Sequence, residues 1–287
     1  MFVVLGSTGH VGSAVVATLL DAGCPVTAVV RDKAKAEHLR ARGAQVEIAD
    51  VGDVDRLRRV FRKGRRAFLL NPPAPASTDT DVVEHRSMRD ILSALDGSGL
   101  EKVVLESAYG AQPGERIGDL SVLFDFEQAL KAQPTQATIL RAAYYMTNWD
   151  PLLDAARGGN LPTMFPADLR IPMVAPSDLG RAAVRLLQAP PAQGDIHYVE
   201  GPARYSSGEV AHAFSQALGR PVVLSIIPRE KWKESYARQG FSAAAADAYA
   251  RMTAISVDGG FDLPSNPERG SVTLQDYVFK LCRTGAT

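Results

Sequence analysis

The first twenty residues constrain the fold of this chain more than any other segment. An apolar run over Met1–Leu5 leads into Gly6, Gly9 and Gly12, which stand three residues apart. Apolar residues at helical spacing follow directly in residues 11–22. A strand, a glycine-rich turn and a helix in this order can bind a pyrophosphate, because free N–H groups at the start of the helix face the anion. The segment therefore predicts a dinucleotide-binding unit.

Each glycine of this turn has an expected task. Gly6 permits the tight turn, Gly9 lets backbone N–H groups approach the phosphates, and Gly12 lets the helix pack close to the strand. We expect the whole turn to contact the cofactor: Gly6, Ser7, Thr8, Gly9, His10, Val11 and Gly12.

The first half of the chain alternates strands and helices with short connections, which is typical of a parallel sheet covered on both faces. We predict an α/β fold with a doubly wound parallel sheet of the Rossmann type and a smaller C-terminal substrate lobe. The expected strands are Phe2–Leu5, Val26–Val30, Gln45–Ala49, Ala67–Leu70, Lys102–Glu106 and Thr138–Arg141. The expected helices cover residues 11–22, 33–42, 53–63, 79–98 and 119–132.

After Asn148 the pattern becomes less regular. We therefore predict an NAD(P)-binding core over residues 1–150 and a mixed α/β lobe on the substrate side over residues 151–287, which returns some elements to the core. In this lobe we expect strands at His197–Glu200 and Val222–Ile227, and helices at Pro151–Arg157, Asp178–Gln188, Ser206–Leu218 and residues 229–256.

Composition excludes several function classes. The 32 basic and 32 acidic residues balance, so no overall field attracts nucleic acid or an anionic membrane. No uninterrupted apolar stretch approaches the roughly 20 residues of a membrane span. The five histidines lack the spacing of metal ligands, so we predict no metal site. Cys24 and Cys282 lie far apart and are expected to be reduced thiols of a cytoplasmic protein.

The ends of the second and third strands indicate the adenosine side of the cofactor. Arg31 ends the second strand, where an NAD-specific site usually has an acid, and its guanidinium suits a 2′-phosphate. Lys35 adds a second positive charge, so we predict NADP(H), while Asp32 keeps NAD(H) open. After the third strand, Asp50 and Val51 either contact the adenine or, for Asp50, begin the next helix.

The fourth and fifth strands end in residues that suit the nicotinamide side. Asn71 and Pro72 follow the fourth strand and form either a cofactor contact or a rigid turn. Ser107 and Tyr109 follow the fifth strand; we assign Ser107 to the cofactor, and Tyr109 could donate a proton. No tyrosine is followed four residues later by a lysine, which excludes the usual acid–base pair of short-chain dehydrogenases.

Aromatic residues follow the sixth strand. Tyr144 and Tyr145 are candidates for a catalytic or stacking contact with nicotinamide or a flat substrate. The alternative is that these rings join the two lobes.

Taken together, these residues resemble the NmrA-like family, an atypical branch of the short-chain dehydrogenases that includes quinone reductases and azoreductases. The resemblance covers most of the chain. It rests on Val3–Gly12 (VVLGSTGHVG), Val30–Arg31, Leu140–Asn148 (LRAAYYMTN), Asp178–Ala183 (DLGRAA) and Tyr198–Pro202 (YVEGP).

This resemblance implies a Rossmann fold that binds NADP, with Arg31 on the 2′-phosphate and the glycine turn on the pyrophosphate. Reductases of the related isoflavone type have a lysine after the fifth strand, where this sequence offers Glu127. A carbonyl reductase is therefore disfavoured, and we predict an NADPH-dependent reductase of a flat electrophile such as a quinone. The alternative is a non-catalytic NADP(H) sensor that binds a regulatory protein. The expected partner is thus a small molecule or, for a sensor, a protein, and a homodimer is an open option.

Overall fold

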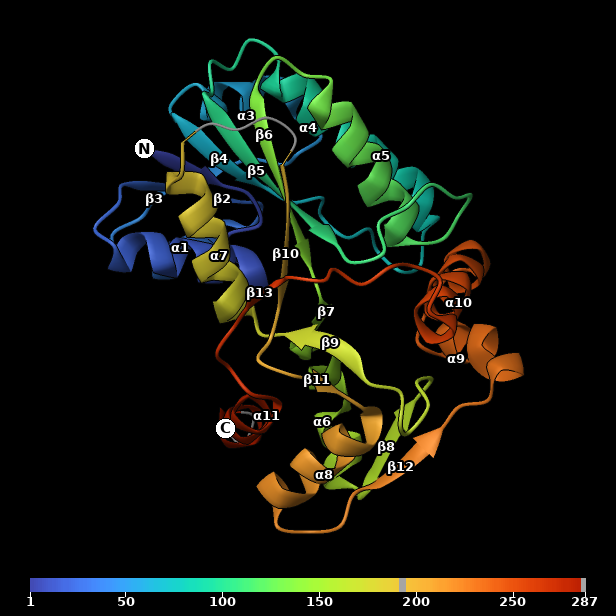
Figure 1. Ribbon diagram of the computed structural model, residues 1–287. Helices are drawn as coiled ribbons and strands as arrows, with labels where there is room; N and C mark the ends of the chain where they lie inside the picture. Colours follow the sequence, from blue (N-terminus) through green and yellow to red (C-terminus); the bar gives the residue numbers. More distant parts are fainter. Residues whose placement is uncertain (191–194, 285–287) are drawn as a thin grey trace.

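The computed structural model describes residues 1–190 and 195–284, and a parallel sheet forms its centre (Figure 1). The sheet has 8 strands in the order β13-β10-β6-β5-β4-β1-β2-β3, and every pairing recorded in it is parallel. All five residues of β2 are buried, as expected for a strand covered on both faces. The strands are β1 (Phe2–Val4), β2 (Val26–Val30), β3 (Gln45–Ile48), β4 (Arg66–Leu69), β5 (Lys102–Ala108), β6 (Gln136–Ala142), β10 (Asp195–Glu200) and β13 (Glu268–Arg269).

Helices cover both faces of this sheet. One face packs against α1, α2 and α7, and the other against α3, α4 and α5, so the core consists of two apolar layers. The chain first builds strands outward from β1 to β3 and then returns to β4 on the other side of β1. The gap between β1 and β4 is therefore the point where the strand order reverses. The helices are α1 (His10–Asp21), α2 (Ala36–Ala41, preceded by the short helix η1 at Lys33–Lys35), α3 (Val54–Phe61), α4 (Thr80–Leu95), α5 (Asp119–Lys131) and α7 (Pro176–Gln188).

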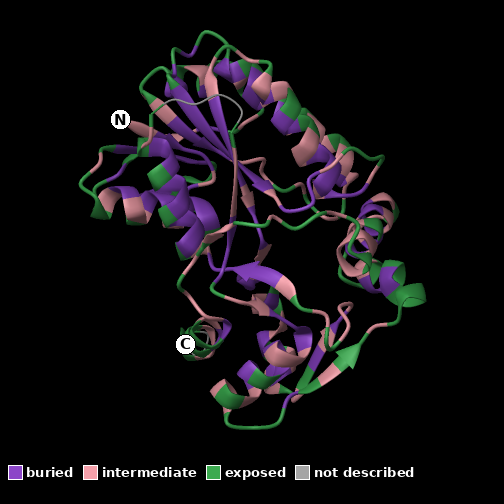
Figure 2. Ribbon diagram, in the orientation of Figure 1, coloured by how far each residue is buried: buried purple, intermediate pink, exposed green. Residues whose placement is uncertain are grey.

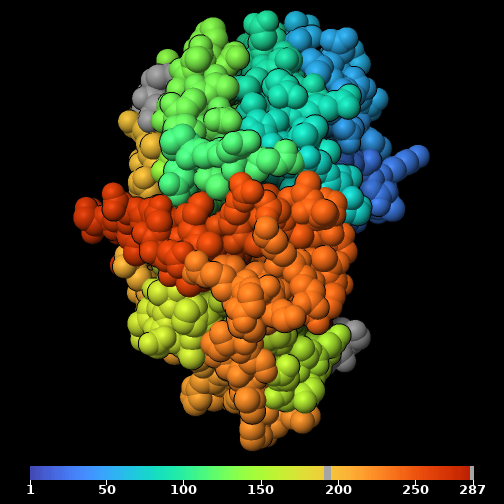
Figure 3. Space-filling view, turned by 90° about the vertical axis from the view of Figure 1, so that its right-hand side faces the viewer, coloured from blue at the N-terminus to red at the C-terminus, as the bar shows by residue number. Residues whose placement is uncertain are grey.

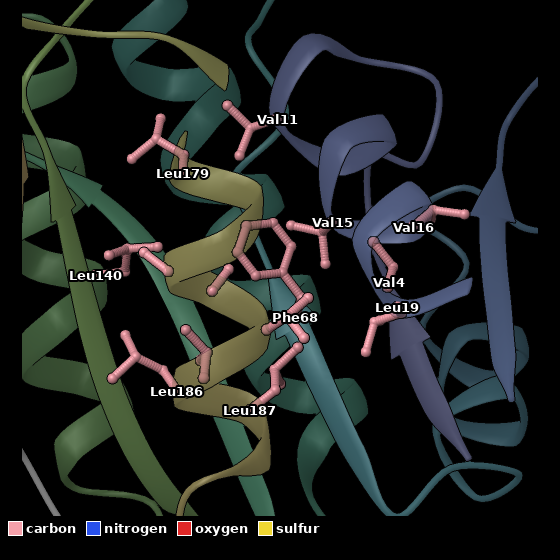
Figure 4. Packing of buried hydrophobic residues seen from close by; sticks show 14 of the residues in the cluster. Val4, Val11, Val15, Val16, Leu19, Phe68, Leu140, Leu179, Leu186 and Leu187 are labelled. Carbon is pink, nitrogen blue, oxygen red and sulfur yellow. The ribbon is translucent and has the colours of Figure 1, made fainter. Parts of the chain in front are cut away.

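Close packing of α1 against α7 fixes the position of the glycine turn. Val11 and Val15 of α1 meet Leu179 of α7 above Phe68 of β4 (Figure 4). At the crossing, a Cβ atom added to Gly180 would lie 2.8 Å from the backbone of Ala14. Only glycine allows this approach, which accounts for the glycine in the DLGRAA segment.

The second part of the structure has its own apolar cluster, which includes Trp149, Met146 and Phe214. Buried stretches of this part are purple in the lower half of Figure 2. Two small sheets frame it, with strand orders β11-β9-β7 and β12-β8. Its strands are β7 (Tyr144–Tyr145), β8 (Asn160–Thr163), β9 (Ile171–Val174), β11 (Arg204–Tyr205) and β12 (Val223–Ile226). Its helices are η2 (Met146–Leu152), α6 (Leu153–Arg157), α8 (Ser207–Leu218) and α11 (Leu274–Thr284).

A helical hairpin crosses from the second part to the Rossmann core. It contains η3 (Arg229–Lys231), α9 (Trp232–Arg238) and α10 (Ala243–Asp258), and residues of this stretch form the orange band across the middle of the molecule in Figure 3. The Ser242 N–H donates to the Ala76 carbonyl at 2.9 Å, and the Tyr249 hydroxyl donates to Asp119 at 3.0 Å. The hairpin is therefore attached to the loop after β4 and to the start of α5.

The structure confirms the predicted Rossmann-type fold, while several elements differ from the prediction. Residues 229–256 are largely helical, as expected, and form three helices; the chain turns between α9 and α10 at Gly240, whose φ is +90°. β5 extends two residues past the expected Glu106, since Ala108 still pairs with Ala142. Five strands were not predicted: β7, β8, β9 and β11 in the second part, and the two-residue β13 at the edge of the main sheet.

Candidate functional site

The glycine turn is shaped as a phosphate-binding loop. Gly6 has φ of +61°, and its carbonyl accepts a hydrogen bond from the Gly9 N–H at 2.8 Å. The buried Ser7 hydroxyl donates to the Val4 carbonyl at 2.7 Å, so this side chain supports the turn from inside. A Cβ atom on Gly12 would lie 2.2 Å from the Gly6 carbonyl oxygen. The predicted need for glycine at positions 6 and 12 thus has a steric cause.

The start of α1 has the features that an anion needs. Gly9 is the N-cap residue and no side chain caps the helix there. Thr8, Gly9 and His10 are exposed, whereas Val11 is buried. The first N–H groups of a helix lack partners within the helix and have a positive potential. The turn therefore fits a pyrophosphate, with Thr8, Gly9 and His10 at its surface and Ser7 and Val11 below it.

The end of β2 presents exposed cations. Arg31 and Lys35 are both exposed, and Lys35 lies in the short helix η1. The Asp32 carboxylate accepts a hydrogen bond from the Ala34 N–H at 2.8 Å and thereby caps η1, so this acid stabilises the local fold. This cap uses one oxygen of an exposed carboxylate. The positive charges of Arg31 and Lys35 at the same end suit a phosphate.

After β3, Asp50 closes a turn rather than capping α3. Its carboxylate accepts the Gly52 N–H at 2.9 Å, while Asp53 caps the helix through the Arg56 N–H at 3.0 Å. Val51, in the same turn, is half-buried. The predicted adenine contact of Asp50 and Val51 remains compatible with this geometry.

The loop after β4 is held by Glu84 of α4. The Asn71 side-chain amide donates to the Glu84 carbonyl at 3.1 Å, and the Ala74 N–H donates to the Glu84 carboxylate at 2.9 Å. Burial, together with the nearby Asp119, raises the pKa of Glu84 to about 8. The Asn71 side-chain oxygen is buried and has no hydrogen-bond partner among the described residues. Pro72 continues this fixed loop, and the free amide oxygen suits a donor on a ligand.

Ser107 belongs to a buried polar network. Its hydroxyl donates to Glu127 of α5 at 2.5 Å, and the Arg141 guanidinium binds the same carboxylate with two hydrogen bonds of 2.8 and 2.7 Å. Glu127 is fully buried. The acid that replaces a lysine in this region therefore joins α5 to β5 and β6, and the Ser107 hydroxyl is already engaged.

Tyr109 lies inside the protein. It is 6% exposed and packs edge-on against Tyr198, with ring centres 5.3 Å apart. Its hydroxyl has no hydrogen-bond partner among the described residues. Burial and the nearby Glu200 carboxylate raise the pKa of Tyr109 above its ordinary value. This placement disfavours Tyr109 as a proton donor to a substrate.

Tyr144 and Tyr145 have different surroundings, although they are adjacent in β7. Tyr144 packs edge-on against Trp149 and Phe165 and thus contributes to the second part of the structure. Tyr145 turns back to the main sheet, where its hydroxyl donates to the Glu106 carboxylate of β5 at 2.5 Å. Both half-buried rings lie where the chain leaves the carboxyl edge of β6.

Glu106 is a candidate site residue that the sequence reasoning missed. It is 7% exposed, and burial raises its pKa to about 7. An available signal was a carboxylate inside an otherwise apolar strand, Val103–Glu106, since a charged group is rarely buried there without a role or a partner.

The candidate site thus comprises the glycine turn, with the exposed Arg31 and Lys35 on one side and the buried Glu84 and Glu106 on the other.

The sequence profile of the NmrA-like family matches residues 1–259. The chain belongs to the NmrA-like family. The family that its motifs resemble is thereby confirmed.

Several known proteins are similar to this NmrA-like chain. It is 28% identical to an NAD(P)H azoreductase of Xenophilus azovorans over 89% of this chain and 87% of that protein. Its fold is similar to that of an Escherichia coli NADPH-dependent quinone oxidoreductase crystallised with NADPH, with a TM-score of 0.82, 21% identity, and coverage of 98% and 99% of the two chains. A Citrobacter triphenylmethane reductase complexed with NADP(H) gives a TM-score of 0.78 at 20% identity, with 98% and 99% coverage.

Other features of the described residues complete the comparison with the sequence. Cys24 and Cys282 are free thiols. Within residues 1–190 and 195–284, no cluster of three or more histidine, cysteine or acidic side chains is arranged to bind a metal ion. No helix in these ranges has the length and apolar character that crossing a membrane requires.

Proposed function

We propose that this NmrA-like protein is an NADPH-dependent reductase of a flat, electrophilic small molecule such as a quinone. One observation supports this most directly: an uncapped phosphate-binding turn is followed, at the end of β2, by the exposed Arg31 and Lys35. Relatives that are named azoreductase, quinone oxidoreductase and triphenylmethane reductase support the same class of acceptor.

The residues divide the task of binding along the carboxyl edge of the sheet. The glycine turn would hold the pyrophosphate, and Arg31 and Lys35 the 2′-phosphate. Asp50 and Val51 would contact the adenine. The loop of Asn71 and Pro72 follows β4, on the other side of β1 from β2, and would border the nicotinamide half. NADPH supplies the hydride, and the chain supplies proximity and orientation for a second, flat molecule.

An acceptor screen tests the activity. Purified protein is mixed with NADPH and a series of quinones, and the loss of nicotinamide absorbance is followed. We expect turnover above the uncatalysed rate for at least one quinone. Tight NADP binding without turnover for any acceptor would instead identify a sensor, whose partner would then be a protein.

Arg31→Ala tests the choice of cofactor. Loss of a charge-assisted contact with a phosphate costs about 2 kcal/mol, so NADPH should bind about thirtyfold more weakly while NADH binding changes little. Titration calorimetry with both nucleotides measures this difference. The matched control is Arg42→Ala, which removes another exposed arginine at the far end of α2. Equal losses for NADPH and NADH in Arg31→Ala would show that this guanidinium does not contact a 2′-phosphate.

A further inference from the structure

A buried carboxyl group and a tyrosine meet at the carboxyl edge of the sheet. Glu106 precedes the last two residues of β5, and the Tyr145 hydroxyl donates to its carboxylate at 2.5 Å. Glu106 is buried, whereas Tyr145 is half-buried. Tyr145 is therefore the more accessible member of a hydrogen-bonded pair whose other member lies deeper in the core.

No cation balances the Glu106 carboxylate. Among the described residues, Glu106 forms no ion pair. Its side chain lies on the same face of β5 as Val104, toward the apolar layer formed with α1 and α7. Its partner across the sheet in β6 is Leu140. The titratable groups around the pair are Tyr145 itself, from β7, and Asp119, from the start of α5, which acts on Tyr145. A carboxyl group in such surroundings retains a proton at higher pH than an exposed one.

The pair lies where a reduction would need a proton. β5 follows β4 in the sheet, on the side of the β1–β4 gap opposite the basic end of β2. A cofactor that places its 2′-phosphate near Arg31 and its pyrophosphate on the glycine turn would extend its nicotinamide toward the ends of β4 and β5. Tyr145, which enters from β7, then borders the same region.

We propose that Tyr145 and Glu106 form the proton-donating pair for the reduced acceptor. This inference rests on the proposed reductase function. Addition of a hydride to a quinone leaves one oxygen as an anion. The Tyr145 hydroxyl gives its proton to that oxygen and forms a new O–H bond. The Glu106 carboxyl proton moves to the tyrosine oxygen, and water returns a proton to Glu106, so that one proton is consumed for each hydroquinone formed.

The arrangement also compensates for the missing lysine of short-chain dehydrogenases. A lysine favours proton donation by tyrosine because its positive charge stabilises the phenolate. Here a protonated carboxyl group takes that place by returning a proton to the phenolate directly. The rate of reduction should therefore fall as the pH rises. The pair acts only while Glu106 is protonated, and this requires a pH near or below the raised pKa of Glu106, about 7.

The first test is a direct titration of the protein without any acceptor. Infrared difference spectra recorded from about pH 5.5 to about pH 9 should show a carboxylic acid band that wild-type protein loses with a midpoint near 7 and that Glu106→Gln lacks. The comparison with Glu106→Gln isolates this residue from Glu84. A spectrum in which Glu106 is already ionised at the lowest pH would overturn the proposal.

The second test is kinetic and uses the full-length protein with NADPH and 1,4-benzoquinone. Wild-type kcat should fall as the pH rises above 7, and Glu106→Gln and Tyr145→Phe should each lower kcat at low pH by about tenfold or more and flatten the profile. The double variant should be no slower than the slower single variant, because the two groups act as a unit. The control is Tyr277→Phe, which removes another tyrosine–carboxylate hydrogen bond, of 2.7 Å to Asp150, and should keep the wild-type profile.

These outcomes separate the pair from the function on which it rests. Wild-type protein that binds NADPH but reduces no acceptor would overturn both proposals. A Glu106→Gln variant with the wild-type kcat and pH profile would overturn only the proton-donating pair and leave the reductase intact. Higher KM values with unchanged kcat in both variants would assign the pair to acceptor positioning and would also contradict proton donation.

Discussion

The two ends of the candidate site use charge in opposite ways. At the outer end, Arg31 and Lys35 are exposed after β2. At the inner end, Glu84 and Glu106 are buried, and burial raises the pKa of each carboxyl group. The glycine turn lies between these ends, because β1 separates β2 from β4 in the sheet.

This difference separates binding from stability. Exposed charges are screened by water and salt, so they affect a charged ligand more than they affect folding. Buried acids lose hydration, so their ionisation opposes folding and depends on pH. Substitutions at the inner end should therefore change stability, and substitutions at the outer end should change cofactor affinity alone.

Glu84→Gln is expected to show the largest effect on stability. The pKa of Glu84 is about 8 in the folded protein and 4.5 in the unfolded reference, so the folded state binds the proton more tightly. Wild-type stability therefore falls as the pH rises from about 4.5 to about 8. At about 1.4 kcal/mol per pKa unit, this loss amounts to several kcal/mol. The glutamine keeps an oxygen for the Ala74 N–H, so the variant should be more stable than wild type at pH 8.5 and similar to it at pH 4.

Urea unfolding at a series of pH values measures this difference. Glu37→Gln removes an exposed carboxyl group of α2 and serves as the control, with no pH-dependent gain expected. If Glu84→Gln changed the free energy of unfolding by the same small amount at every pH, ionisation of the buried Glu84 would not oppose folding, and the inner end would resemble the exposed outer end.

The outer end and the glycine turn could be predicted from the sequence because their signals are local. The turn, Arg31 and Lys35 fall within one strand–turn–helix–strand unit. The inner end depends on contacts between distant residues: Tyr145 and Glu106 are 39 positions apart, and Tyr249 and Asp119 are 130 apart. The periodicity of the sequence does not specify which distant side chains contact each other, so these two pairs could not be predicted from the sequence.

The same reason explains the strands that the sequence analysis missed. β7, β11 and β13 have two residues each, which is too short for an alternating pattern. β8 and β9 contain Pro162 and Pro172, and proline is rare inside strands, so the sequence pattern does not predict strands there. Their pairing is decided by the neighbouring elements of the second part.

Tyr249→Phe should have an intermediate effect, since it removes the hydrogen bond between α10 and Asp119. Loss of one such bond costs about 1 kcal/mol, and Asp119 retains its partly buried position at the start of α5. We expect faster amide hydrogen exchange throughout α10 than in wild type. In the control Tyr236→Phe, the lost bond joins Tyr236 to Thr253 within the hairpin, so the attachment of α10 to the core should persist. Equal exchange in both variants would show that Tyr249 does not attach the hairpin.

Lys35→Ala should have the smallest effect on stability and still alter binding. Lys35 is exposed in η1, so its removal should change the free energy of unfolding by less than about 0.5 kcal/mol. A screened contact with a 2′-phosphate contributes less than a direct one, so NADPH should bind about threefold more weakly at low salt and NADH equally well. Titrations at low and high ionic strength measure this, and the difference between wild type and variant should shrink as salt is added. A loss of NADPH affinity that persists at high salt would mean that Lys35 makes a buried contact with the bound nucleotide. The charge at the outer end would then be buried in the complex, like the charges at the inner end.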